Sequence, residues 1–105
     1  MAQARTASGD IIDIRPLGAA LRERVTTAFL KSTQLELVHL VLPNGKALRE
    51  HRVSGEITVQ CIEGLMDITT ATTTHRLAPG QLVHAHALLA LADSTALLTI
   101  CLVPQ

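Results

Sequence analysis

Residues Gly45 to Gly64 have the sequence GKALREHRVSGEITVQCIEG, and this stretch decides the fold. A histidine follows Gly45 after five residues, and the pair Glu63-Gly64 predicts a tight turn at the far end. Between them, apolar and polar residues alternate along 56–62, which is the period of a half-buried strand. The segment therefore predicts a loop, a strand and a turn in succession.

Short strands separated by glycine or proline turns continue on both sides of this segment. Leu17, Leu21 and Val25 recur at four-residue spacing, which predicts one or two helical turns. Before them, we expect an edge strand over 9–16 that ends at Pro16. Further strands are expected at 25–30, 35–42, 56–62, 65–70 and 75–77, one or two within 81–91, and a last one at 95–103. Many short strands without a long helical pattern favour an all-β barrel or sandwich.

The composition allows one packed domain. The chain has 105 residues, 48% of them apolar and 17% charged, which is enough for one hydrophobic core and too short for two. Residues 1–8 are small and mostly polar and are expected to fray, which leaves 9–105 as a single domain. Nine basic residues balance nine acidic ones, and Phe29 is the sole aromatic residue. Without a basic stripe or stacking aromatics, nucleic acid is not an expected partner.

The distribution of apolar residues indicates in which cellular compartment the protein is expected. The most apolar tract, 88–102, is interrupted at 93–95 and is shorter than the about 20 residues of a membrane span, so no membrane partner is expected. The first residues lack the apolar stretch of a signal peptide, which favours a cytoplasmic protein. Cys61 and Cys101 lie in apolar strand-like segments, and we expect both to be free buried thiols.

In the order and spacing of its turns and strands, the chain over 35–103 resembles a small single-domain cupin. The first cupin motif has a glycine, five residues, His-x-His, three residues, a glutamate, six residues and a glycine. Gly45, His51 and Gly64 fall into that register without a gap. The resemblance implies an all-β double-stranded β-helix, or jelly-roll barrel, here with a short N-terminal helical turn. It also implies one divalent metal such as Fe, Mn, Ni or Zn, held inside the barrel by histidines and a glutamate.

The first motif departs from the family pattern at two ligand positions. The second histidine position is Val53, and the glutamate position is Ile57. Glu56 is adjacent, but an offset of one residue points its side chain to the opposite face of a strand, unless a bulge at Gly55 re-aims it. The wall of the pocket is therefore mostly apolar, and we expect the ligand pocket to be lined by His51, Val53, Ile57, Val59, Cys61 and His86.

The second cupin motif has a glycine, five residues, Pro-x-Gly, two residues and a histidine. Counted from Gly80 without a gap, its histidine position is Leu91; if about five residues with the turn are missing, it is His86. His84 and His86 share one strand face, and if that face is inward they could join His51 in a three-nitrogen site. The candidate metal ligands are therefore His51, His84, His86 and Glu56. Structural roles are favoured for the remaining two, His39 and His75.

Three functions follow from these residues. The first is a non-catalytic cupin-like protein that binds a small molecule in a mostly apolar barrel. The second is a metal-dependent enzyme of the dioxygenase or isomerase type, which uses the histidine cluster. The third is a module whose main partner is itself, a homodimer formed through the outward side chains Thr58, Gln60 and Ile62. The residues show no nucleophile triad, and the sequence does not decide whether the protein is an enzyme.

Overall fold

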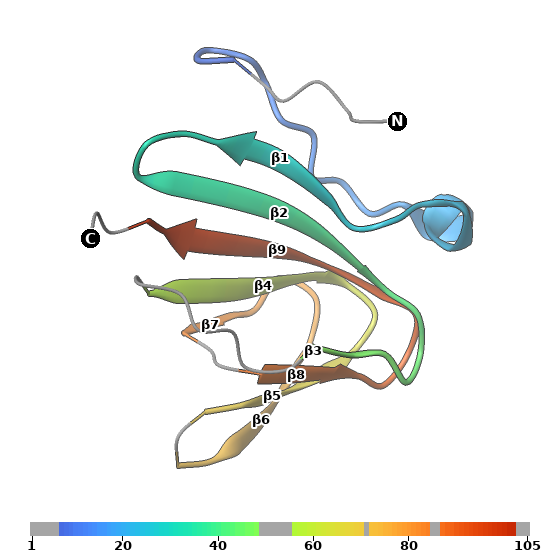
Figure 1. The fold of residues 1–105 in the computed structure, drawn as a ribbon. Coiled ribbons are helices and arrows are strands. Elements are labelled where there is room, and N and C mark those ends of the chain that lie inside the picture. Colours follow the sequence, from blue (N-terminus) through green and yellow to red (C-terminus); the bar gives the residue numbers. More distant parts are fainter. Residues whose placement is uncertain (1–6, 49–55, 71, 85–86, 103–105) are drawn as a thin grey trace.

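Two antiparallel β-sheets face each other in the computed structural model, which describes residues 7–48, 56–70, 72–84 and 87–102 (Figure 1). The five-stranded sheet has the order β1 (Thr27–Lys31), β2 (Leu35–Leu42), β9 (Ser94–Cys101), β4 (Ile57–Glu63) and β7 (Leu82–His84). The four-stranded sheet has the order β3 (Ala47–Leu48), β8 (Ala87–Ala90), β5 (Met66–Thr69) and β6 (Thr74–Leu77). The predicted all-β architecture is confirmed.

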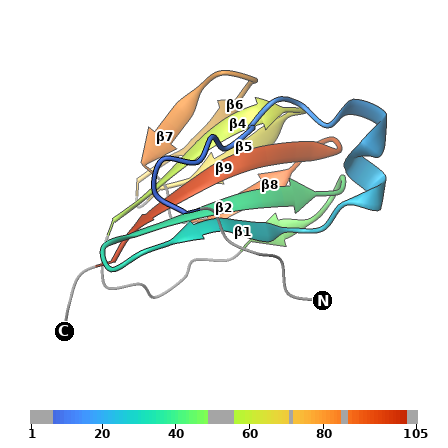
Figure 2. The ribbon, with the colours of Figure 1, turned by 90° about the horizontal axis from the view of Figure 1, so that it is seen from above.

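The long central strands are built from aliphatic residues that alternate between two environments. β2 pairs with β9 along all eight residues, from Leu35 opposite Cys101 to Leu42 opposite Ser94. Figure 2 shows β1, β2, β9 and β4 side by side. Successive side chains point to opposite faces, so one face of each strand looks into the space between the sheets. The buried core there consists of Leu40, Leu42, Val59, Cys61, Met66, Ile68, Leu77, Leu88, Ala90, Ala96 and Leu98.

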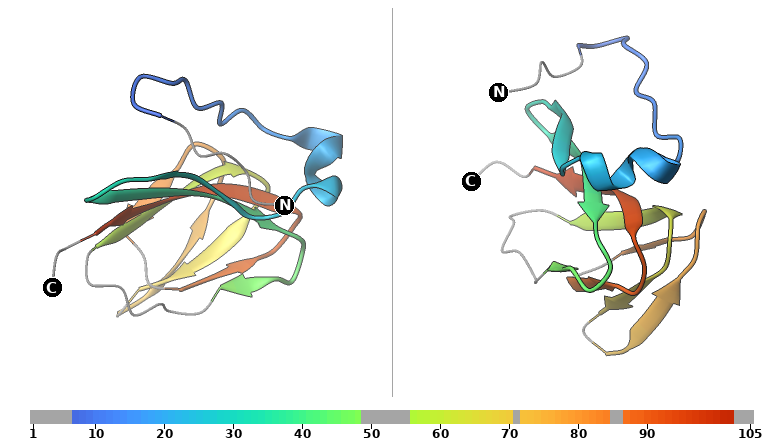
Figure 3. Two further views of the ribbon diagram at one scale, coloured as in Figure 1. Left: turned by 45° about the horizontal axis from the view of Figure 1, so that its top comes forward. Right: turned by 90° about the vertical axis from the view of Figure 1, so that its right-hand side faces the viewer.

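The 3₁₀ helix η1 (Gly18–Glu23) confirms the predicted helical turn and lies at one end of the five-stranded sheet (Figure 3). The carboxylate of Glu63 accepts hydrogen bonds from the main-chain N–H groups of Leu17 and Gly18, at the start of the helix. Leu21 is 3% exposed and anchors the middle of the helix. Among the described residues, no helix combines the length and the apolar character needed to cross a membrane.

The turn between β4 and β5 requires a glycine. Gly64 has φ of +88°, in the left-handed region, and a Cβ atom there would lie 2.5 Å from the carbonyl oxygen of Asp93 and 2.7 Å from Cα of Ser94. The hydroxyl of Ser94, fully buried, accepts a hydrogen bond from the main-chain N–H of Leu65 at 3.1 Å. The hairpin is therefore held directly against the turn that precedes β9.

Two expectations about the ends of the chain were wrong. The segment 9–16 forms no strand; Ile11 is 93% exposed there, and the carboxylate of Asp13 turns back to bind the main chain and guanidinium of Arg15. The apolar pattern predicted a strand, but none of the strands in the described ranges pairs with this segment. Cys101 is exposed at the end of β9, whereas Cys61 is buried as expected, and both thiols are free.

Candidate functional site

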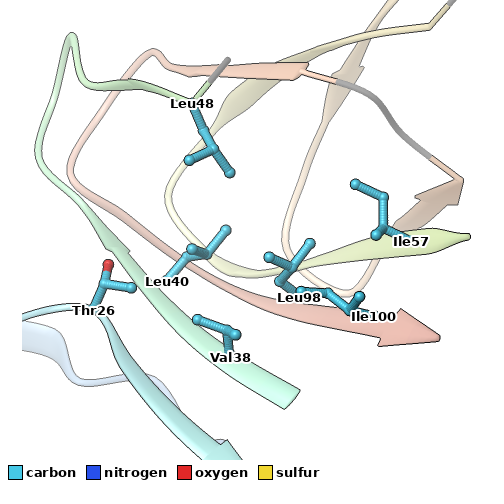
Figure 4. Close-up of a pocket in the computed structure, with 7 residues that line it drawn as sticks. All are labelled: Thr26, Val38, Leu40, Leu48, Ile57, Leu98 and Ile100. Carbon is cyan, nitrogen blue, oxygen red and sulfur yellow. The ribbon is translucent and has the colours of Figure 1, made fainter. Parts of the chain in front are cut away.

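A cavity of about 340 Å³ lies between the five-stranded sheet and the short strand β3 (Figure 4). Figure 4 shows the side chains of β2, β4 and β9 on one side of it and Leu48 of β3 across from them. The residues that line the cavity are Thr26, Val38, Leu40, Leu48, Ile57, Leu98 and Ile100. We call this cavity the barrel pocket.

The register of the sheet assembles the apolar wall of the barrel pocket. Val38 of β2 lies opposite Leu98 of β9, and Ile57 of β4 lies opposite Ile100 of the same strand. Residues paired across neighbouring strands have their side chains on the same face, a few ångströms apart. Three strands that are distant in the sequence therefore present one continuous aliphatic surface.

The described lining of the barrel pocket offers almost no polar group. Thr26 is its one polar residue, and the Thr26 hydroxyl accepts a hydrogen bond from the main-chain N–H of Val41 at 2.9 Å and donates to the Val41 carbonyl at 3.4 Å. No charged side chain of the described residues lines the pocket. A ligand there would meet methyl and methylene groups and one hydroxyl that already has its partners.

The predicted pocket residues fall in different parts of the structure. Ile57 lines the barrel pocket, while Val59 and Cys61 continue the same face of β4 into the core, 1% and 0% exposed. Burial raises the pKa of the Cys61 thiol, with a smaller contribution from Glu63, so this residue remains a protonated thiol in the core. Three further members of the predicted set, His51, Val53 and His86, lie outside the described residues.

Two of the predicted metal ligands lie on the outer face of the sheet. His84 pairs with Thr58, whose side chain points away from the core, so His84 does so too. Its Nε2 lies 3.6 Å from Oε1 of Glu56, and the two side chains are 60% and 84% exposed. His84 therefore points outward, whereas a three-nitrogen site with His51 requires it to point into the barrel.

The described inner wall does not fit a metal ion. Hard and borderline ions require imidazole or carboxylate ligands, and this wall presents aliphatic side chains and one buried thiol instead. Within the part of the chain that the structure describes, no three His, Cys, Asp or Glu side chains come together in a group that could hold a metal. His51 and His86 belong to the part that is not described.

Sequence reasoning missed most of the lining of the barrel pocket. Val38, Leu40, Leu98 and Ile100 lie in the predicted strands 35–42 and 95–103, and residues two apart in a strand share a face. This two-residue period does not distinguish an aliphatic side chain that fills the core from one that borders a cavity. Leu48 was missed because β3 has two residues, too few for a periodic signal.

The comparisons with known proteins define the fold. No protein-family model and no curated protein matches the sequence. A conserved protein of unknown function from Streptococcus pyogenes has a similar structure with a TM-score of 0.71 and 20% identity, over 100% of this chain and 97% of the other. A cupin superfamily protein from Desulfitobacterium hafniense is similar with a TM-score of 0.70 and 18% identity, over 89% and 95% of the two chains.

A third similar structure comes from a regulatory protein. It is the Cupin_2 domain of an XRE family transcriptional regulator from Enterobacter cloacae, with a TM-score of 0.60 and 15% identity, over 77% of this chain and 97% of that domain. The class that the two sheets and their topology define is a small all-β barrel. The chain has the cupin fold, as the spacing of Gly45, His51 and Gly64 indicated.

Proposed function

We propose that this protein binds a small, uncharged and predominantly apolar molecule in the barrel pocket. The observation that carries the proposal is the chemistry of the described lining: six aliphatic side chains and the hydroxyl of Thr26, whose hydrogen bonds stay within the protein. Apolar surface buried there gains roughly 25 cal/mol per Å². A charged ligand group would lose its hydration without finding a partner, which disfavours ionic ligands.

The volume of the barrel pocket limits the size of the ligand. At about 340 Å³, it has more than twice the volume of an engineered apolar cavity of roughly 150 Å³ that binds benzene. It also falls at the small end of the roughly 300–1,000 Å³ that ligand pockets span. A molecule with one or two rings, or a short branched chain, suits this space.

Solution NMR can test this proposal with three probes of similar shape: toluene, benzyl alcohol and benzoate. Toluene and benzyl alcohol should give saturable shifts of the methyl signals of Leu98 and Ile100, which line the barrel pocket. Benzoate should give none, because its carboxylate would have to be desolvated. The absence of saturable shifts with toluene and benzyl alcohol, or equal binding of benzoate, would overturn the proposal.

A pair of adjacent leucines in β9 provides matched variants. Leu98 lines the barrel pocket, whereas Leu97 lies on the opposite face of the strand and is half-buried. Leu98→Phe places the larger side chain in the pocket and should abolish toluene binding, while Leu97→Phe should leave it unchanged. If Leu98→Phe does not fold, Ile100→Phe provides a second variant that fills the barrel pocket from the same face of β9. Toluene binding that survives in a folded pocket variant would contradict the proposed site.

Metal content separates this proposal from the dioxygenase or isomerase alternative. The purified protein should contain less than stoichiometric Fe, Mn, Ni and Zn, and should remain so after incubation with these ions and dialysis. A stoichiometric metal that is lost in a His51→Ala variant would favour the enzyme and contradict a purely apolar binding role. His51→Ala is informative because His51 is the residue that keeps the register of the first motif.

A further inference from the structure

A second cavity, of about 190 Å³, lies on the opposite face of the same sheet. The alternation of β2 separates the two cavities, because Val38 and Leu40 face the barrel pocket and His39 between them faces outward. The chain at the start of β1 alternates in the same way, with Thr26 on the barrel pocket and Val25 and Thr27 on the second cavity. The lining of this second cavity, the outer cavity, consists of Glu23, Arg24, Val25, Thr27, Phe29 and His39.

The buried end of the outer cavity contains a histidine, His39, one of whose ring nitrogens lacks a hydrogen-bond partner. His39 is 8% exposed, and its Nε2 atom is fully buried and makes no hydrogen bond in the structure. Its ring stacks on Phe29 with 4.9 Å between the ring centres and 16° between the planes. Burial lowers the pKa of His39, so the neutral ring is the form in place. The stacked pair therefore presents two uncharged aromatic rings to the cavity.

The outer rim of the cavity carries one charge of each sign. Glu23 and Arg24 are consecutive and exposed, and neither side chain forms an ion pair or hydrogen bond with another described residue. A purely anionic ligand would approach Glu23, and a purely cationic one would approach Arg24, so each meets one repulsive group. A purely apolar ligand would leave both charges of the rim without a partner. A ligand with both charges suits this lining.

We propose that the outer cavity is a second binding site, which takes a small zwitterion of the size of a free amino acid. In this site the carboxylate of the ligand pairs with Arg24 and its ammonium group with Glu23, while its side chain lies against the stacked rings of Phe29 and His39. The volume, slightly above that of a cavity that holds benzene (roughly 150 Å³), suits a molecule of about nine non-hydrogen atoms such as leucine. This site is independent of the barrel pocket, because the sheet lies between them.

Three probes of the same branched shape test the proposal by NMR of the amide signals of Thr27, Phe29 and His39. L-Leucine carries both charges, 4-methylpentanoate lacks the ammonium group, and 3-methylbutylamine lacks the carboxylate. Leucine should shift the three signals saturably, and each analogue should bind about fivefold more weakly, the scale of one exposed ion pair. Absence of a saturable shift with leucine, or equal binding of the two analogues and leucine, would overturn the proposal, as would shifts confined to other residues.

Exposed charge variants test the roles of the two rim residues without disturbing the core. Arg24→Gln should weaken binding of leucine and of 4-methylpentanoate about fivefold and should not weaken binding of 3-methylbutylamine. Glu23→Gln should have the converse effect. Arg22→Gln is the matched control, because Arg22 pairs with Asp93 and does not line the outer cavity. Leucine binding that is equally weakened by Arg22→Gln, or unchanged by both rim variants, would contradict the proposed contacts.

A competition experiment distinguishes the outer cavity from the barrel pocket. Saturating toluene should leave the affinity for leucine unchanged, and Leu98→Phe should do the same, because Leu98 lies on the other face of the sheet. Displacement of leucine by toluene would place leucine in the barrel pocket and refute a second site. Failure of toluene binding with intact leucine binding would refute only the function proposed for the barrel pocket.

Discussion

Replacement of Gly64 by alanine should be among the most destabilising single-methyl substitutions in this chain. Two costs combine at this position. The residue has φ of +88°, and an L-residue in that region costs about 1–2 kcal/mol. The added Cβ would also lie 2.5 Å from the carbonyl oxygen of Asp93 and 2.7 Å from Cα of Ser94. These are main-chain atoms that cannot rotate away, so overpacking adds roughly 1–3 kcal/mol.

Gly80 provides a control in which the first cost is present and the second is absent. Its φ is also +88°, but an added Cβ would find no atom within 4 Å. Gly80→Ala should therefore cost only about 1–2 kcal/mol, and Gly64→Ala a total of roughly 2–5 kcal/mol. Domains of this kind have unfolding free energies of about 5–15 kcal/mol, so Gly64→Ala should lose a large part of the stability of the fold.

Urea unfolding followed by far-UV circular dichroism is the suitable assay, because the chain contains no tryptophan or tyrosine for fluorescence. The midpoint for Gly64→Ala should fall well below that for Gly80→Ala, with the slope of the free energy against urea unchanged. The close approach of the hairpin to the turn before β9 would be refuted if the two variants lost the same free energy. A Gly64→Ala variant too unstable to fold beside a folded Gly80→Ala would agree with the prediction.

Three further predictions concern charge, thiols and assembly. Hydrogen bonds from the main-chain N–H of Asn44 and from Arg22 lower the pKa of Asp93, so this carboxylate stabilises the fold fully above its unfolded value of 3.8 and loses that effect as pH falls through the lower folded pKa. In thermal melts, Asp93→Asn should flatten the decline of the melting temperature below about pH 4, and an unchanged decline would count against this. Ellman's reagent should label Cys101 quickly in the folded protein and Cys61 only after denaturation, because Cys61 is buried; two fast thiols in the folded protein would contradict its burial. Light scattering should show a homodimer at micromolar concentration, as the outward positions of Thr58, Gln60 and Ile62 in the sequence predict, and a monomer would refute it.

The candidate site was predictable only in part. Alternation along 56–62 placed Ile57, Val59 and Cys61 on one inward face, and the structure has them there. The same rule could not orient the short strand β7, in which either Val83 or its two neighbours could face the core. Pairing with β4 decides this, because Val83 lies opposite Val59 and packs against the core, which turns His84 outward. The orientation of a three-residue strand depends on its neighbour.

The sequence by itself determined the order of strands and turns. The aliphatic segment 35–42 has the bounds of β2, and the turn at Gly64 lies where the Glu63-Gly64 pair predicted it. These features depend on residues close together in the chain, which is why a local pattern predicts them. The order and spacing of these strands and turns, with Gly45, His51 and Gly64 in the register of the first cupin motif, carried the resemblance to a small cupin.

Only the tertiary structure decided which segments find partners and where space is left between them. The isoleucines of 9–16 have the composition of a strand, yet no strand of the described residues pairs with them, and Ile11 and Ile14 stay exposed. Whether an aliphatic side chain such as Leu98 borders a cavity depends on the separation of two sheets, and whether His39 is buried depends on the packing of Phe29 against it. Both are relations between residues far apart in the sequence, which alternation and composition do not encode.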